Sequence, residues 1–161
     1  MRVMARILFV CTGNTCRSPM AEAILNARVK AAGLEEEIKV LSAGLAAPAD
    51  AAVSPRARAA LARRSLDLSV HRSRPVLPEY VRAADVVLTM TAAHKRAVAA
   101  MLPEAAGKVY TLAEYAGEEA DVADPIGGDE EVYERCAAEI ERLLDKCWQK
   151  FARLAGKNNK M

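Results

Sequence analysis

Aromatic side chains are scarce in this chain of 161 residues: Phe, Trp and Tyr make up 4% of it, whereas apolar residues make up 52%. Alanine and aliphatic side chains must therefore fill the core, and the length suits one domain. No apolar run approaches the roughly 20 residues that a transmembrane helix needs. Arg2 and Arg6 precede an apolar stretch that is too short for a signal peptide and lacks a cleavage site. We expect a cytoplasmic protein with no membrane partner.

Cysteine and histidine are also few. The four cysteines do not make a disulfide framework in a chain of this size. The two histidines have no Cys or Asp partners at metal-ligand spacing, so we expect neither a metal nor a cofactor. A net charge of +2 with 27% charged residues gives no sign of a nucleic-acid partner. Cys136 and Cys147 share the apolar stripe of a C-terminal helix, which predicts core packing for both.

The segment 11–18, Cys-Thr-Gly-Asn-Thr-Cys-Arg-Ser, joins two well-defined patterns. The apolar run 7–10 before it predicts a short buried strand. Pro19 and the residues after it predict a helix, whose first turn tolerates proline. A tight loop between a strand end and a helix N-terminus gathers backbone N–H groups at the positive end of the helix dipole. The segment therefore predicts an anion-binding loop.

The two ends of this loop carry the side chains that point to chemistry. Cys11 and Arg17 have the spacing Cys-x5-Arg. A helix N-terminus and a nearby guanidinium favour the thiolate form of a cysteine, which is its nucleophilic form. Arginine offers parallel N–H donors to phosphoryl oxygens, and Ser18 can donate a hydrogen bond to the sulfur. The spacing alone is weak, and a buried cysteine that ends a core strand is the alternative. The surrounding residues favour a nucleophile under a phosphate cradle.

The residues between these ends are expected to bind the phosphoryl group: Thr12, Gly13, Asn14, Thr15 and Cys16. Gly13 either lets the backbone approach the anion or takes a positive φ. Asn14 tolerates the left-handed region and can fix the turn through its amide. Because the loop curls around an anion, the sulfur of Cys16 can lie near enough to join an oxidised Cys11, which predicts a redox-sensitive site.

Cys-Thr-Gly-Asn-Thr-Cys-Arg-Ser-Pro, from residue 11, closely resembles the signature of low-molecular-weight protein tyrosine phosphatases. The length, the early motif and the late pair Asp124-Pro125 match as well, so the resemblance covers nearly the whole chain. Thr15 and the pair Gly127-Gly128 look like the bacterial protein arginine phosphatase branch. The resemblance implies hydrolysis of protein phosphoarginine through a phosphocysteine on Cys11, with phosphorylated proteins as partners. A protein tyrosine phosphatase of the same family is the alternative.

Further site residues follow from the resemblance. The family's general acid and base is the aspartate of the Asp-Pro pair, here Asp124; alone, Asp-Pro-x-Gly-Gly is typical of a turn. In the family, a serine and a histidine matching Ser42 and His71 hydrogen-bond the loop asparagine, here Asn14. Without the resemblance, His71 would be interpreted as an ordinary partly buried histidine. The family commonly has an acidic residue after the third strand, where this chain has 91–93, Thr-Ala-Ala, so this segment supplies no carboxylate.

Two more remote functions are alternatives to a phosphatase. Arsenate reductase resembles these proteins but relays a disulfide through extra cysteines, and none lies between Cys16 and Cys136. A phosphopeptide-binding module without activity would need neither Cys11 nor Asp124. The arginine-rich segment 54–74 is interpreted as a solvated face, with attraction of phosphorylated protein as the alternative. We expect a monomer.

Strand and helix patterns alternate along the chain. Strands are expected at about 5–10, 38–42, 85–90 and 108–111. Helices are expected at about 19–32, 55–64, 92–102 and 129–154, with a short one after Pro78. This order predicts an α/β fold: a single doubly wound domain over residues 1–161, with a four-stranded parallel sheet flanked by helices. The phosphate loop follows the first strand, at the sheet edge where such folds bind ligands. Residues 156–161 are expected to be a frayed tail.

Overall fold

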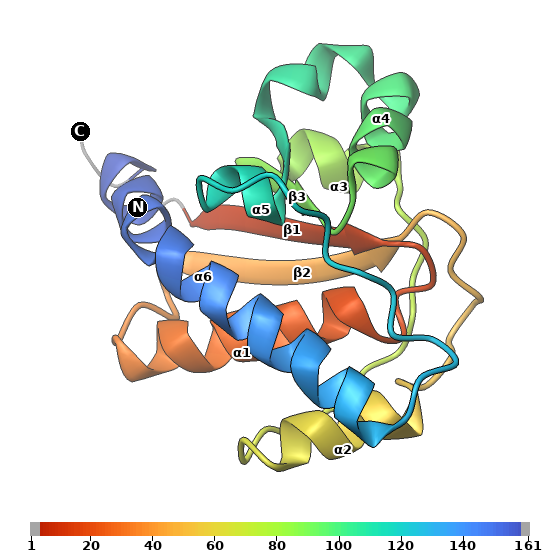
Figure 1. The fold of residues 1–161 in the computed structure, drawn as a ribbon. Helices are drawn as coiled ribbons and strands as arrows, with labels where there is room; N and C mark the ends of the chain where they lie inside the picture. Colours follow the sequence, from red (N-terminus) through yellow and green to blue (C-terminus); the bar gives the residue numbers. More distant parts are fainter. Residues whose placement is uncertain (1–3, 159–161) are drawn as a thin grey trace.

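The structure, a computed structural model, describes residues 4–158. Four parallel strands form one sheet in the order β2-β1-β3-β4, which confirms the predicted sheet (Figure 1). The strands are β1 (Ala5–Cys11), β2 (Ile38–Gly44), β3 (Val86–Thr89) and β4 (Val109–Thr111). The chain places β2 on one side of β1 and β3 on the other, so the loop after β1 lies at the topological switch point of the sheet, where α/β proteins bind ligands.

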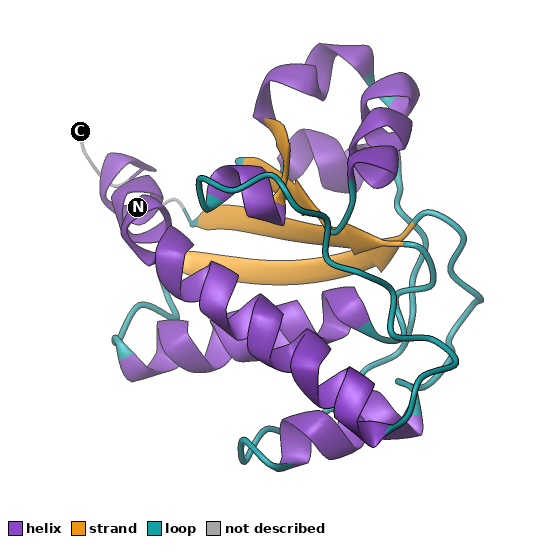
Figure 2. Cartoon of the chain, in the orientation of Figure 1, coloured by secondary structure: helices purple, strands orange, loops and turns teal. Residues whose placement is uncertain are grey.

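Helices cover both faces of this sheet, as the colouring in Figure 2 makes clear. The helical elements are α1 (Arg17–Ala31), α2 (Pro55–Ala62), α3 (Pro78–Ala83), α4 (Ala92–Met101), the 3₁₀ helix η1 (Pro103–Lys108), α5 (Leu112–Tyr115) and α6 (Glu130–Asn158). Successive side chains of β1 point to opposite faces of the sheet, so this strand contributes to two apolar clusters, one on each face. Ile7 and Phe9 belong to one cluster, and Leu8 and Val10 belong to the other. The first cluster packs under α1, α2 and α6, and the second under α3, α4 and η1.

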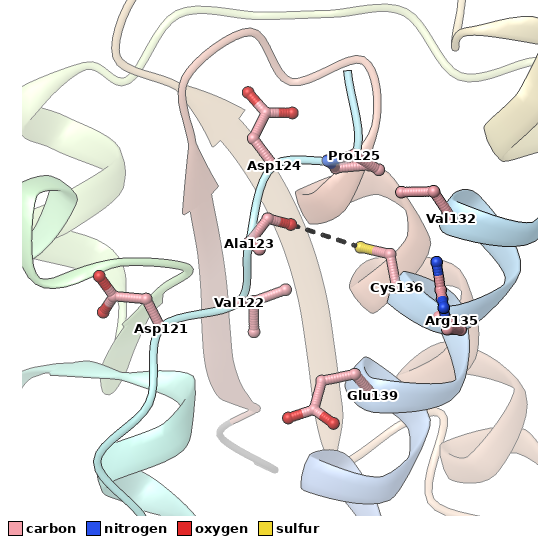
Figure 3. A pocket seen from close by; sticks show the side chains of 9 residues that line it. All are labelled: Asp121, Val122, Ala123, Asp124, Pro125, Val132, Arg135, Cys136 and Glu139. Carbon is pink, nitrogen blue, oxygen red and sulfur yellow. Dashed lines mark hydrogen bonds between the residues drawn. The ribbon is translucent and has the colours of Figure 1, made fainter. Parts of the chain in front are cut away.

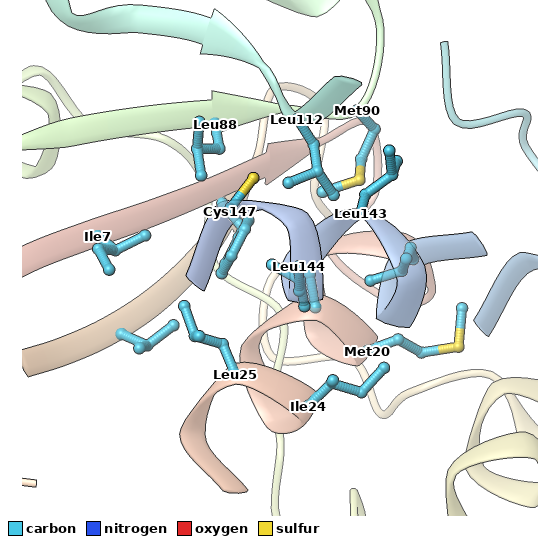
Figure 4. Packing of buried hydrophobic residues seen from close by; sticks show 14 of the residues in the cluster. Ile7, Met20, Ile24, Leu25, Leu88, Met90, Leu112, Leu143, Leu144 and Cys147 are labelled. Atoms are coloured by element: carbon cyan, nitrogen blue, oxygen red, sulfur yellow. The ribbon is translucent and has the colours of Figure 1, made fainter. Parts of the chain in front are cut away.

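The aliphatic core expected from the composition is present. Figure 4 shows α6 packed beside α1 on the same face of the sheet, with Cys147 among leucine and isoleucine side chains. Cys147 is fully buried, and this burial raises the pKa of its thiol to about 12. Because apolar burial is the main favourable term in folding, the position of Cys147 fits the predicted packing role.

Local capping explains where several helices begin. The side chain of Ser54 accepts a hydrogen bond from Ala57 N, with Pro55 as the first helical residue of α2, as predicted. Thr91 caps α4 in the same way. The short helix α5 was not predicted, although its capping box, Thr111 with Glu114, is visible in the sequence.

Two expectations need correction. Helix α6 continues to Asn158, so residues 156–158 are helical and do not belong to a frayed tail, whereas 159–161 lie outside the described residues. The arginines of 54–74 are not simply a solvated face: Arg64 pairs with Glu134 and Glu141 of α6, which raises its pKa.

Within residues 4–158, no helix is long and apolar enough to span a membrane.

Candidate active site

The loop after β1 is held against β2 by a close backbone approach. A Cβ atom on Gly44 would lie 2.5 Å from Thr12 O and 2.9 Å from Asn14 N, so only glycine fits at this strand end. The loop carbonyls of Cys11 and Thr12 accept hydrogen bonds from Leu45 N (3.0 Å) and Ala46 N (2.9 Å). The end of β2 therefore fixes the first turn of the loop.

Asn14 organises the centre of the loop. It is fully buried, and its φ of 54° lies in the left-handed region, as predicted. Its Nδ2 donates to Ser42 Oγ (2.9 Å) and Ser18 Oγ (3.0 Å), and its Oδ1 accepts from Arg74 N (3.0 Å). His71 Nε2 lies 3.0 Å from the Asn14 carbonyl. The structure thus brings Ser42 and His71 to Asn14, where the resemblance placed them.

The directions of these hydrogen bonds follow from the donors available. Asn14 Nδ2 is a donor only, so Ser18 Oγ accepts from it and keeps its own hydrogen for Cys11 Sγ, 2.9 Å away. Ser42 Oγ likewise accepts from Asn14 and donates to Glu22 Oε1 at 2.5 Å. The backbone N–H of Asn14 also points to Cys11 Sγ, at 3.3 Å. Two donors therefore converge on one buried sulfur, which suits a thiolate.

Arg17 and Asp124 meet on the other side of the loop. Arg17 is almost fully buried; its Nη1 donates to Val122 O at 2.9 Å, and its Nη2 lies 3.6 Å from Asp124 Oδ2. The Asp124 side chain is 45% exposed, and its Oδ1 accepts from Ile126 N at 3.1 Å. The guanidinium therefore joins the loop to the Asp-Pro segment and presents the carboxylate to solvent beside it.

Thr15 and Cys16 complete the loop. A Cβ on Gly13 would lie 3.3 Å from Thr15 Oγ1, and Gly13 has no positive φ, so close approach rather than a left-handed turn explains this glycine. Thr15 O accepts from Ser54 N at 2.9 Å, which ties the loop to the start of α2. Burial, with smaller contributions from the Cys136 and Cys11 thiols, raises the pKa of Cys16 well above its usual range.

Cys136 lies nearer to the site than its predicted core role suggested. Its side chain is buried, but its Sγ faces Ala123 O at 3.9 Å, behind the segment that carries Asp124. Figure 3 shows Cys136 on the wall of a cavity of about 350 Å³ between this segment and α6, with the Asp124 carboxylate pointing away from the helix. Burial raises the pKa of Cys136 to about 11. This thiol supports the Asp124 segment from behind.

Sequence reasoning gave no role to His94, yet the structure places it at the loop. His94 Nε2 lies 2.9 Å from Thr12 Oγ1, and the side chain is only 8% exposed. The available signal was its position: it occupies the first turn of α4, directly after β3, at the ligand-binding edge of the sheet.

A buried sulfur with converging donors, an arginine and a neighbouring carboxylate form the arrangement that phosphoryl transfer through a cysteine requires, and they define a cysteine-dependent phosphatase. Residues 6–158 match the family described as low molecular weight phosphotyrosine protein phosphatase, and the chain belongs to that family.

Known members of the family resemble this chain over most of its length. A protein-arginine-phosphatase of Bacillus subtilis is 42% identical over 139 residues, which cover 86% of this chain and 91% of that protein. A solved cysteine-to-serine mutant of YwlE arginine phosphatase, with a phosphorylated active-site serine, is 39% identical with a TM-score of 0.87 and covers 92% of this chain and 99% of its own. A solved low molecular weight protein tyrosine phosphatase from T. tengcongensis is 44% identical, also with a TM-score of 0.87, over 91% and 99%. The family is shared, whereas the named activities differ.

Proposed function

We propose that this protein is a phosphatase that hydrolyses phosphoarginine in proteins through a phosphocysteine intermediate. The observation that carries the proposal is the convergence of Ser18 Oγ and Asn14 N on Cys11 Sγ, beside Arg17. We expect it to act on phosphorylated proteins as a cytoplasmic monomer, without a metal or cofactor.

In the first step, the Cys11 thiolate attacks phosphorus, and the bond from phosphorus to the substrate nitrogen breaks. Arg17 and the loop N–H groups bind the equatorial phosphoryl oxygens, where negative charge develops. Asp124 gives its proton to the leaving nitrogen, so that the arginine side chain departs as a guanidinium that keeps its positive charge. A phosphocysteine on Cys11 remains.

In the second step, the Asp124 carboxylate accepts a proton from a water molecule, which attacks phosphorus as the phosphorus–sulfur bond breaks. Phosphate leaves, and Cys11 returns to the thiolate form. Ser18 Oγ and Asn14 N, at 2.9 Å and 3.3 Å from Cys11 Sγ, stabilise the thiolate when it leaves phosphorus as well as when it attacks. The solved relative with a phosphorylated serine at the active site supports a covalent phosphoenzyme.

Thr15 supports phosphoarginine as the substrate. A phosphorylated guanidinium is planar and rich in N–H donors, and an unpaired buried donor costs about 1–3 kcal/mol. The Thr15 hydroxyl lies at the loop beside Gly13 and can accept such a donor. After Asp124-Pro125 the chain has Ile126 rather than an aromatic residue, so no aromatic wall for a phenyl ring stands there. The B. subtilis relative is named for this activity.

Two substitutions test the mechanism. Cys11→Ser should give a folded protein without measurable turnover, because a serine hydroxyl is not ionised in this loop. Asp124→Asn should bind inorganic phosphate normally but turn over about 10²- to 10⁴-fold more slowly, since an amide cannot donate the proton. Turnover is followed by phosphate release from a phosphoarginine protein, with circular dichroism as the folding control. Activity retained by Cys11→Ser would show that the mechanism is wrong.

A further inference from the structure

His94 is a buried polar side chain that takes no part in the two chemical steps. It is the third residue of α4, and only 8% of it is exposed. Its Nε2 contacts Thr12 Oγ1 at 2.9 Å, whereas its Nδ1 is buried and has no hydrogen-bond partner among the described residues. The His94 ring therefore makes one hydrogen bond, to the nucleophile loop, and its protonation determines the direction of that bond.

The unpartnered nitrogen decides which tautomer is present. A hydrogen on Nδ1 would be a buried donor without an acceptor, next to the partial positive charge of the first turn of α4. The hydrogen therefore resides on Nε2, and His94 donates to Thr12 Oγ1. The Thr12 hydroxyl accepts this bond and is fixed in direction.

The surroundings also keep the ring neutral. Burial and the charge of Arg17 lower the pKa of His94, and Asp121 and Asp124 oppose this effect without cancelling it. A neutral Nε2–H tautomer is consistent with a single hydrogen bond to Thr12.

The first turn of α4 contacts the second loop of the site as well. Asp121 Oδ1 accepts from Ala92 N at 2.9 Å, so a carboxylate from the Asp124 segment reaches the helix start where the sequence itself has no acidic residue. The next residue, Val122, accepts from Arg17 through its carbonyl. The start of α4 therefore holds the loop of Cys11 through His94 and the segment of Asp124 through Asp121.

We propose that His94 is a positioning residue of the phosphatase: its Nε2–H bond to Thr12 fixes the nucleophile loop against α4 and thereby sets Cys11 relative to Asp124. The proposal rests on the proposed function, because it assumes that these two side chains act together in phosphoryl transfer. A positioning role of this kind acts on kcat more than on KM.

The test is a double-mutant cycle on kcat with p-nitrophenyl phosphate, a substrate that does not depend on arginine specificity. His94→Leu should lower kcat by about three- to tenfold and change KM by less than about twofold, the effect of one lost hydrogen bond. Thr12→Val keeps the shape of an exposed side chain and should have the same effect. The double variant should be no slower than either single variant.

Two further variants separate positioning from general structure. His94→Gln presents an amide N–H at the same reach and should regain most of kcat, whereas Lys95→Gln, at the next position of α4, should behave as wild type. Additive losses in the cycle, a kcat for His94→Gln no higher than for His94→Leu, or an unaffected Thr12→Val would each overturn the proposal. Wild-type protein without turnover of p-nitrophenyl phosphate would instead reject the proposed phosphatase function.

Discussion

Ser18 Oγ lies 2.9 Å from Cys11 Sγ and accepts from Asn14 Nδ2, which leaves its hydrogen free to be donated to the Cys11 thiolate, because a thiolate can only accept. The nucleophile is therefore oriented from β2, through Ser42 and Asn14, as well as from its own strand. Because Asn14 holds the Ser18 hydroxyl in this orientation, Ser18 stabilises the Cys11 thiolate both before attack and after hydrolysis, without reorganisation during the reaction.

Replacing Asn14 should damage both stability and rate. Asn14→Ala loses the bonds to Ser18, Ser42 and Arg74 and places alanine at a φ of 54°, so we expect a loss of about 2–5 kcal/mol in the free energy of unfolding. Asn14→Gly is the matched control: it loses the same bonds but accepts the φ, and should be about 1 kcal/mol more stable than alanine. Denaturant unfolding measures both, and equal stabilities would contradict the role of the left-handed conformation.

Cys16 should protect Cys11 from irreversible oxidation. Peroxide converts the Cys11 thiolate to sulfenic acid, and the Cys16 thiol then displaces water to form a disulfide, which a thiol reductant reverses. Because burial raises the pKa of Cys16 and only a thiolate attacks, the disulfide should form faster as the pH rises from about 7 to 9. Cys16→Ser should lose activity irreversibly, and Cys136→Ala is the control. Mass spectrometry that finds no Cys11–Cys16 link in oxidised wild type would refute this role.

His94 should make stability depend on pH. Burial and Arg17 lower its pKa below the usual 6.5, so the unfolded chain binds this proton more readily than the folded protein. The free energy of unfolding is then undiminished above about pH 6.5 and falls as the pH is lowered from there through the folded value. Urea unfolding between about pH 7.5 and 5 should show a steeper loss for wild type than for His94→Gln. Identical slopes would show that His94 titrates normally.

Thr15 should select the substrate. In the tyrosine phosphatases that the sequence resembles, a branched aliphatic residue at this position lines an apolar slit. Thr15→Ile should therefore lower kcat/KM on a phosphoarginine peptide by about tenfold to a hundredfold, because a guanidinium N–H loses its acceptor, and raise it on phosphotyrosine. Thr15→Ser, which keeps the hydroxyl, is the control. If both activities fall together, Thr15 is not the selector.

The sequence predicted the elements whose causes are local. The apolar run before residue 11, the caps Ser54 and Thr91 and the stripe of α6 each depend on neighbouring residues, and the strands lie where expected. Family resemblance supplied Ser42 and His71, whose partner Asn14 is 28 and 57 positions away.

The features that sequence reasoning missed depend on contacts between distant segments. The bond from His94 to the loop spans 82 positions, and nothing in its local pattern specifies a partner. Cys136 reads as one more apolar residue of a helix, because only the tertiary structure places it behind the Asp124 segment. Helix α6 extends beyond Leu154 because packing of Ala155 against the core outweighs the polar composition of this end.

The most direct test of the account is the ratio of kcat/KM on two peptides of identical sequence, one with phosphoarginine and one with phosphotyrosine, measured with the wild-type protein and with Cys11→Ser as the blank. The account predicts that phosphoarginine is the better substrate by at least about tenfold and that Cys11→Ser hydrolyses neither. A clear preference for phosphotyrosine would contradict it and make the protein a tyrosine phosphatase with the same mechanism.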